Sequence, residues 1–249
     1  GKLTEEWRRQ HPGVEPASEL LKRIKAEKEK LVKKGKIKKS KPLPPIKEEE
    51  KPFELPEGWV WCRLGEIVIK TEYGTSEKAA YSNNGVPVLR MGNIKMNGSI
   101  NYDNLKYISP NSKALPKLYL KYNDILFNRT NSYELVGKSA IFKNKEANYS
   151  FASYLIRLSP SKEINADFTN FYMNSQFFKV TQLEPGVIQQ NGQANFNGTK
   201  LKNVIIPIPP IQEQNQIVKS INHVLNYLEQ IETQTEKNGR YADKLMQAV

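Results

Sequence analysis

Cysteine and histidine are almost absent from this 249-residue chain, and long apolar runs are missing altogether. The single cysteine, Cys62, excludes an internal disulfide and fits a reducing cytosol, and its neighbours Trp61 and Leu64 favour a buried structural thiol. The two histidines, His11 and His223, are too far apart in the sequence for a zinc site or a proton relay. The scarcity of these two residue types leads us to expect no bound metal. No run approaches the ~18 apolar residues of a membrane span, so we expect a cytoplasmic protein.

Negative charge is also scarce, since 38 Lys and Arg stand against 26 Asp and Glu and give a net charge of +12. Residues 1–52 hold 16 of the basic and 9 of the acidic residues, so +7 of this charge lies there. A basic balance favours a polyanionic partner, usually a nucleic acid, although a solubilising surface explains the same balance. The 38% of hydrophobic residues suffices for a buried core, which excludes a wholly disordered chain.

Catalytic motifs are missing as well. No glycine-rich phosphate loop precedes an expected helix, and Ile208, before Pro209-Pro210, offers no carboxylate or amide for amino-methylation of a base. The acidic run 48–50 lies in a proline-rich stretch and indicates a solvated charge run rather than a nuclease centre. We therefore expect a binding module with no catalytic residue of its own.

The chain divides into three expected parts, residues 1–52, 53–208 and 209–249. In the first, residues 17–34 predict a short basic helix with a possible cap at Ser18, an apolar stripe of leucine and isoleucine and a stop at Gly35. Four prolines in residues 36–52 predict an extended linker.

The middle part predicts an α+β domain with a mixed, mostly antiparallel sheet. Strands are expected at residues 59–63, 86–91, 99–102, 124–128, 138–142, 154–158 and 204–208, and helices at 167–174 and 175–183. The polar, glycine-punctuated stretch 184–200 predicts a loop.

The third part predicts a helix of roughly 38 residues after Pro209-Pro210. Its seam steps by four and three residues, which is typical of a coiled coil. The positions are Ile217, Ile221, Val224, Leu228, Ile231, Thr235, Asn238, Ala242, Leu245 and Val249. A buried Asn238 can fix the register of a helix pair, while local weakness near Gly239 explains the polar positions equally well.

The motifs IPIPPIQEQNQIV and KLMQAV, together with LPEGWVWCRLGEI at residues 55–67, resemble the DNA-specificity (S) subunits of type I restriction–modification enzymes. The opening segment, GKLTEEWRRQHPGVEPASELLKRIKAEKEKL, is similar to the segment that comes after LMQAV in that family. The chain therefore resembles one period, or a half-length form, of a subunit usually built as two target-recognition domains and two helices.

The resemblance implies a non-catalytic subunit that reads one half of a bipartite site in double-stranded DNA. It implies an anchored modification (methyltransferase) subunit that carries S-adenosylmethionine, a restriction subunit in the full complex, and no cofactor in this chain. A second copy, or a second half, is expected to pair through the long helix. The residues assigned to this pairing are Ile217, Ile221, Val224, Leu228, Ile231, Asn238 and Leu245.

Three polar segments, residues 90–95, 127–132 and 189–195, are the candidate DNA-reading surface. Arg can bind guanine O6 and N7 together, and Asn or Gln can bind adenine N6 and N7. The candidates are Arg90, Asn93, Lys95, Asn128, Arg129, Thr130, Asn131, Ser132, Gln189, Gln190, Asn191, Gln193 and Asn195, with Lys70, Tyr73, Lys78 and Lys143 as weaker candidates for phosphate contacts. A structural role, in which the side-chain amide caps a turn, would explain the presence of any one of these residues. The resemblance, however, places the three segments on one face.

Two other functions stay open. The chain could be a non-catalytic assembly protein with a vestigial recognition domain, or a fragment of an autonomous nuclease or methyltransferase. Methyl transfer and sequence-preferring DNA binding, measured with and without a modification subunit, separate the three. The lysine-rich helix at 17–34 lacks the mixture of Arg, Asn and Gln of a reading surface, so we expect it to contact phosphates or a modification subunit.

Overall fold

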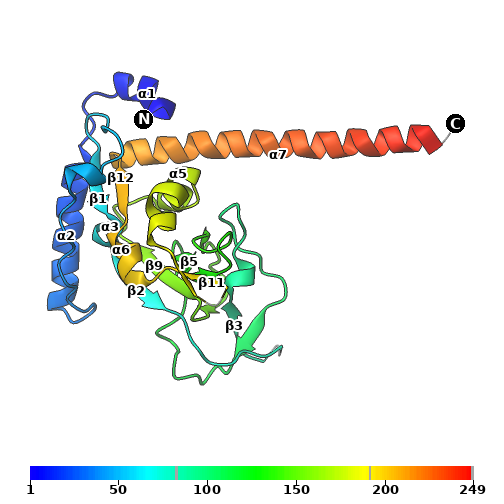
Figure 1. Cartoon of the computed structure of the whole chain (residues 1–249), viewed down its shortest axis with the longest axis horizontal. Helices are drawn as coiled ribbons and strands as arrows, with labels where there is room; N and C mark the ends of the chain where they lie inside the picture. Colours follow the sequence, from blue (N-terminus) through cyan, green and yellow to red (C-terminus); the bar gives the residue numbers. More distant parts are fainter. Residues whose placement is uncertain (82–83, 191, 248–249) are drawn as a thin grey trace.

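The computed structural model describes residues 1–81, 84–190 and 192–247. It consists of a mixed α+β body from which one long helix, α7 (Ile211–Gln247), projects (Figure 1). The N-terminal part lies against the body and supplies the short helices η1 (Lys2–Thr4), α1 (Glu5–Gln10) and η2 (Glu48–Glu50) and the longer α2 (Ala17–Lys33). Among the described residues, no helix is both long and apolar enough to cross a membrane.

The strands of the described residues form four small sheets. The largest has the order β2-β9-β5-β7, built from Val68–Tyr73, Leu155–Pro160, Ile125–Asn128 and Ser139–Ile141. A second has the order β4-β3-β8, from Lys106–Ile108, Val86–Leu89 and Ser150–Phe151. The third pairs β1 (Val60–Arg63) with β12 (Ile205–Ile208), and the fourth is β10-β11-β6, from Ile188–Gln190, Gln193–Asn195 and Thr130–Asn131.

Every described strand pair is antiparallel except β3 with β8, which confirms the predicted mixed, mostly antiparallel α+β fold. The connecting helices are α3 (Leu64–Ile67), η3 (Met91–Asn93), α4 (Ala166–Met173), α5 (Gln176–Phe178), the π-helix η4 (Lys179–Leu183), η5 (Glu184–Gly186) and α6 (Gly198–Asn203). Asn165 caps α4, since its side chain accepts hydrogen bonds from the amides of Asp167 and Phe168.

Several sequence expectations need correction. Residues 99–102 form no strand; Ile100 makes only an isolated bridge to Ile94. Ser18 is not the cap of α2, because the helix begins at Ala17 and Pro16 occupies the cap position. The expected helix 175–183 is instead a short α-helix followed by a π-helix. The expected loop 184–200 contains the 3-10 helix η5, the strands β10 and β11 and the start of α6.

The core joins the N-terminal helix to the body. Leu20 and Ile24 of α2 are fully buried in the same apolar cluster as Ile125 and Phe127 of β5. Cys62 lies in this cluster at 1% exposure, and burial raises the pKa of its thiol well above the ordinary value. The prediction of a buried structural thiol is therefore confirmed.

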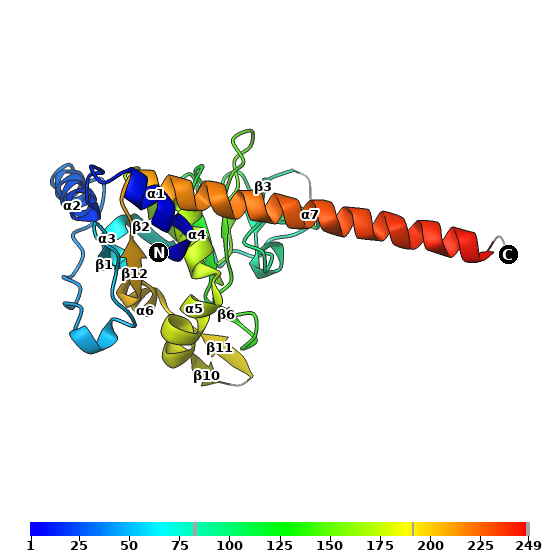
Figure 2. The same cartoon turned by 90° about the horizontal axis from the view of Figure 1, so that it is seen from above.

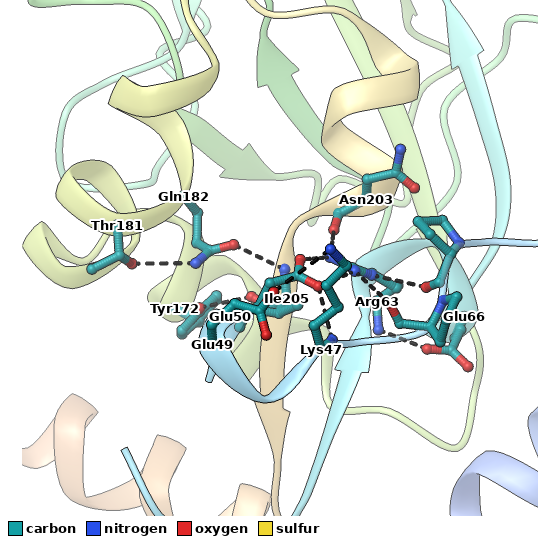
Figure 3. A network of polar contacts seen from close by, with 12 residues as sticks. Lys47, Glu49, Glu50, Arg63, Glu66, Tyr172, Thr181, Gln182, Asn203 and Ile205 are labelled. Carbon is teal, nitrogen blue, oxygen red and sulfur yellow. Dashed lines mark hydrogen bonds and ion pairs between the residues drawn. The ribbon is translucent and has the colours of Figure 1, made fainter. Parts of the chain in front are cut away.

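Arg63, at the end of β1, fixes the proline-rich linker to the body (Figure 3). Its guanidinium donates two hydrogen bonds to the Glu50 carboxylate, at 2.7 and 2.8 Å. It also donates to the carbonyls of Pro44, Pro45 and Asn203 at 3.2, 3.1 and 2.7 Å. The hydrogen bonds from Arg63 hold the pKa of Glu50 below its ordinary value. The extended linker is thus held as a strap across the body.

The first turn of α7 is anchored by a buried carboxylate. Glu213 is 0% exposed and accepts hydrogen bonds from Thr4 Oγ1 at 2.6 Å, from Trp59 Nε1 at 2.8 Å and from Arg8. Gln214, also fully buried, donates to the Pro209 carbonyl at 2.8 Å. The N-terminal segment therefore docks beside the start of α7, as both views show (Figures 1 and 2).

Candidate nucleic-acid interface

The β10–β11 hairpin and β6 form a small polar sheet that projects from the body on the side away from α7 (Figure 2). Gln189 pairs with Ala194, and Gln190 with Gln193, across the hairpin. Gly192 adopts φ +74°, a left-handed conformation that glycine tolerates at a hairpin turn. An amide-rich stretch without an apolar pattern therefore forms a two-stranded ribbon.

Two of the three predicted segments meet in this sheet. Asn131 and Thr130 of β6 pair with Ala194 and Asn195 of β11. The Thr130 hydroxyl donates to Asn195 Oδ1 at 2.7 Å, which couples the two strands through their side chains as well. Chain segments more than 60 residues apart thus present one continuous polar surface.

Arg129 lies directly before β6 and is held by an aromatic ring. Its guanidinium carbon lies 5.2 Å from the ring centroid of Tyr73, a cation–π contact. The Tyr73 hydroxyl in turn accepts a hydrogen bond from the Gly198 amide at 2.8 Å. Tyr73, predicted as a phosphate contact, therefore positions Arg129 in this structure.

The remaining members of the polar sheet differ in accessibility. Gln189 and Gln193 are exposed, while Asn131 and Ser132 are partly buried and share a hydrogen bond from the Ser132 amide to Asn131 Oδ1 at 2.9 Å. The side chain of Gln190 and all of Asn191 lie outside the described residues.

Three predicted base readers are buried and serve the fold instead. Asn93 is 4% exposed; its Oδ1 accepts from the Arg90 amide at 2.9 Å and its Nδ2 donates to the carbonyls of Asn101 and Asp103. Asn128 is fully buried, and its Nδ2 donates to the Leu135 carbonyl at 3.2 Å. Thr130 is 4% exposed, and its hydroxyl is engaged by the neighbouring strand β11. These hydrogen bonds hold the neighbouring loops and strands in place.

The first predicted segment, residues 90–95, follows β3 and forms no strand; it contains the 3-10 helix η3. Arg90 is partly buried and donates from Nη2 to the Asn104 carbonyl at 2.7 Å. Lys95 is exposed. The structure thus joins parts of the segments 127–132 and 189–195 in one sheet, and residues 90–95 are not part of that sheet.

The predicted phosphate-contacting lysines differ in how far their charge is already paired. Lys70 Nζ lies 2.8 Å from Glu72, and Lys143 Nζ lies 2.8 Å from Asp167 and 5.0 Å from the Tyr122 ring centroid. Lys78 is exposed. No three His, Cys, Asp or Glu side chains gather into a possible metal site in the part of the chain that the structure describes.

The predicted helix-pairing positions fall into two groups. Ile217 is 8% exposed and Ile221 packs beside it against the core of the body, so these two stabilise the base of α7 rather than a pairing seam. By contrast, Val224, Leu228 and Ile231 are 51%, 48% and 45% exposed. Asn238 accepts a hydrogen bond from Gln234 at 2.9 Å on the exposed helix. The side chain of Leu245 lies outside the described residues.

Sequence reasoning missed the buried Glu213 and Gln214 in the QEQ motif and the role of Arg63. The signal was present in the motifs, since charged and amide residues stand directly beside apolar ones in WCRLGEI and IQEQNQIV. Their partners, Thr4, Glu50 and Pro209, could not be inferred from spacing.

The protein combines a mixed α+β body, a polar ribbon and a long projecting helix. Comparison with known protein families identifies the class of protein that has this arrangement. Residues 56–238 match the family model described as "Type I restriction modification DNA specificity domain". Because the match covers most of the chain, the chain belongs to this family, and the resemblance noted from the sequence is confirmed.

Two relatives from Escherichia coli are the EcoAI and EcoEI specificity subunits of type I restriction enzymes. The first is 37% identical over 235 residues, covering 87% of this chain and 36% of the relative; the second is 32% identical, covering 91% and 39%. The chain thus spans less than half the length of these relatives.

Two solved structures share the fold. The crystal structure of the HsdS subunit from Thermoanaerobacter tengcongensis matches 93% of this chain and 49% of its own length, with a TM-score of 0.53 and 17% identity. A chain from a study of complex assembly and conformational transition of the type I R-M system matches 99% of this chain and 54% of its own length, with a TM-score of 0.61 and 17% identity.

Proposed function

We propose that this chain is the sequence-reading part of a type I specificity subunit and recognises one half of a bipartite site in double-stranded DNA. The observation that carries the proposal is the polar sheet β10-β11-β6, which gathers Arg129, Gln189 and Gln193 at one end of the body. A two-stranded ribbon is one of the elements that the major groove of B-DNA admits, and these side chain types can bind base edges in pairs of hydrogen bonds. Family membership supports the same function.

The proposal assigns the chemistry to partners. The chain anchors a modification subunit that holds S-adenosylmethionine and methylates the DNA, and a restriction subunit joins in the full complex. The chain itself catalyses no step. The names of its relatives, which are specificity subunits of restriction enzymes, support this division of labour.

A reconstitution experiment tests the proposal against its alternatives. The purified chain is assayed for methyl transfer and for DNA binding across a random library, alone and with a modification subunit. We expect no methyl transfer by the chain alone and a defined half-site consensus in the complex. Methyl transfer by the chain alone would indicate an autonomous enzyme, and a complex without any consensus would indicate an assembly protein.

The exposed apolar positions of α7 support pairing with a second copy or a second half. Val224, Leu228 and Ile231 lie about one turn apart on one face, and all three are half exposed. A helix of 37 residues spans roughly 55 Å, so a pair would hold two recognition domains at a set distance.

Leu228→Lys tests this pairing, because it places a charge in the apolar seam. Gln230→Lys is the matched control, since it adds the same charge two residues further on, on the opposite side of the helix. We expect sedimentation to show the paired mass for the wild type and Gln230→Lys, and the monomer for Leu228→Lys. Equal masses for all three proteins would contradict the pairing.

The lysines of α2 are proposed to contribute no base selectivity. Lys22, Lys25 and Lys33 are exposed, whereas Lys28 donates to the Gly65 carbonyl at 2.7 Å and burial lowers its pKa. Replacing the three exposed lysines with Gln should leave the consensus unchanged. Lys28 is retained so that its contact with α3 stays intact and the fold is not disturbed. A changed consensus would therefore show that α2 takes part in base reading.

A further inference from the structure

A cavity of about 440 Å³ opens between the polar hairpin and the loop that follows β6. The hairpin contributes Gln189 and Gln193, and the loop contributes Ser132, Tyr133 and Glu134. The lining therefore contains two amides, two hydroxyls, an aromatic ring and one carboxylate. Among these groups only the carboxylate offers acceptors without any donor when it is ionised.

Glu134 is ionised at neutral pH. A hydrogen bond from its own backbone amide, and then one from the Ser132 side chain, lower the pKa of the carboxyl below its ordinary value. The side chain is exposed, so it is accessible to a bound molecule. A fixed negative charge beside the proposed interface repels DNA phosphates, and this repulsion lowers affinity for every sequence alike.

The same charge discriminates between base edges in the major groove. Cytosine N4 and adenine N6 present amino donors there, whereas guanine O6 and thymine O4 present acceptors. A carboxylate accepts a hydrogen bond from either amino group and is repelled by either carbonyl. The cavity flanks the ribbon whose dimensions suit the major groove, so a base edge beside Gln189 or Gln193 would also lie beside Glu134.

We infer that Glu134 is a specificity-determining residue that accepts a hydrogen bond from the exocyclic amino group of a cytosine or adenine in the recognised half-site. The inference rests on the proposed function, because it requires that the hairpin end binds double-stranded DNA. It adds a selecting group that opposes binding in general and favours one class of base at one position.

Glu134→Ala in the reconstituted complex has two opposite effects. Binding to unrelated DNA stays constant or strengthens, because a phosphate-repelling charge is lost. At one position of the consensus, the preference for cytosine or adenine over guanine or thymine falls by about 5- to 150-fold, the range of one good side chain–base contact. The measurement is relative affinity across all single-base variants of the selected site.

A base analogue identifies the atom that Glu134 contacts. At the affected position, cytosine is replaced by pyrimidin-2-one, or adenine by unsubstituted purine, so that only the amino group is removed. Loss of the amino group weakens binding by the wild type and has little further effect on Glu134→Ala. Equal losses for both proteins would overturn the contact, because the two changes would then act independently.

Glu49→Ala is the control, since Glu49 is an exposed carboxylate of the linker outside the cavity. It should leave the relative affinities for the single-base variants unchanged. A Glu134→Ala profile identical to the wild type, or an equal loss of affinity for every sequence, would overturn the inference while leaving the proposed function intact. A wild-type complex without any base preference would overturn the proposed function itself, and the inference with it.

Discussion

Two regions of the body use charged and amide side chains for different purposes. Around the β1–β12 pair and the first turn of α7, Arg63 and Glu213 are buried and hydrogen-bonded to other groups of the chain itself. At the hairpin end, Gln189 and Gln193 face solvent, and Arg129 is stacked on the Tyr73 ring. Residue type alone therefore does not separate structural from binding groups; burial and partners do.

Among the substitutions that test this comparison, Arg63→Ala should have the largest effect. The substitution leaves the Glu50 carboxylate and three carbonyls without their donor, so we expect the free energy of unfolding to fall by about 3–5 kcal/mol. Urea denaturation measures this change. Arg9→Ala, which removes an exposed arginine paired with Glu6, is the control and should change stability by less than about 0.5 kcal/mol. Equal effects would refute the structural role of Arg63.

Glu213→Ala should lower stability by about 2–3 kcal/mol, because Thr4, Arg8 and Trp59 lose a shared buried acceptor. The N-terminal segment should also detach from α7, so limited proteolysis should cleave residues 1–16 faster. Glu229→Ala, at an exposed position of the same helix, serves as the matched control. Unchanged cleavage of Glu213→Ala would show that other contacts hold the segment.

At the hairpin end the effect should appear in selectivity instead of stability. Arg129→Ala or Gln193→Ala in the complex should each relax preference at one base position by about 1–3 kcal/mol. Lys143→Ala should instead weaken binding to all sequences alike and reduce its salt dependence. Affinities for single-base variants at two salt concentrations measure both effects. If Arg129→Ala and Gln193→Ala both keep the base preferences of the wild type, the reading surface lies elsewhere.

The smallest effect concerns pH and the strap. The folded-state pKa of Glu50 is lowered from 4.5, so its interaction with Arg63 stabilises the fold above that pH and is lost as the pH falls through the lower folded-state value. Because the Glu50 side chain is 34% exposed, we expect Glu50→Gln to cost only about 1 kcal/mol at pH 7. The difference from the wild type should vanish in acid, as thermal melts between pH 7 and 3 would show. A stability difference that stays constant between pH 7 and 3 would show that it does not arise from the interaction of Glu50 with Arg63.

The sequence predicted the parts whose apolar pattern is strong. The buried strand β5 (Ile125–Asn128) lies within the predicted strand 124–128, and the helix α7 lies where the four-three stepping predicted it. The pattern failed where polar residues alternate without apolar partners, as in β2 (VIKTEY) and in the hairpin, because tertiary pairing determines those strands.

The candidate site was predicted in composition but only partly in position. Amides at 93 and 128 have the same chemistry as those at 189 and 193, yet the first two are buried and bonded to carbonyls. Glu134 escaped notice because a lone glutamate has no sequence signal. Contacts such as Thr4 with Glu213 join residues 209 positions apart, and no local pattern predicts them.

The buried thiol makes the molecule convenient for site-directed labelling. Cys62 is the single cysteine, and its burial and raised pKa suppress the thiolate, the nucleophile that reacts with maleimides and nitroxide reagents. A cysteine introduced at the exposed Met246, next to the C-terminal end of α7, would therefore be the one reactive thiol of the native protein. Dipolar spectroscopy between two such labels would then distinguish parallel helices, whose labels lie close together, from antiparallel helices, whose labels lie far apart.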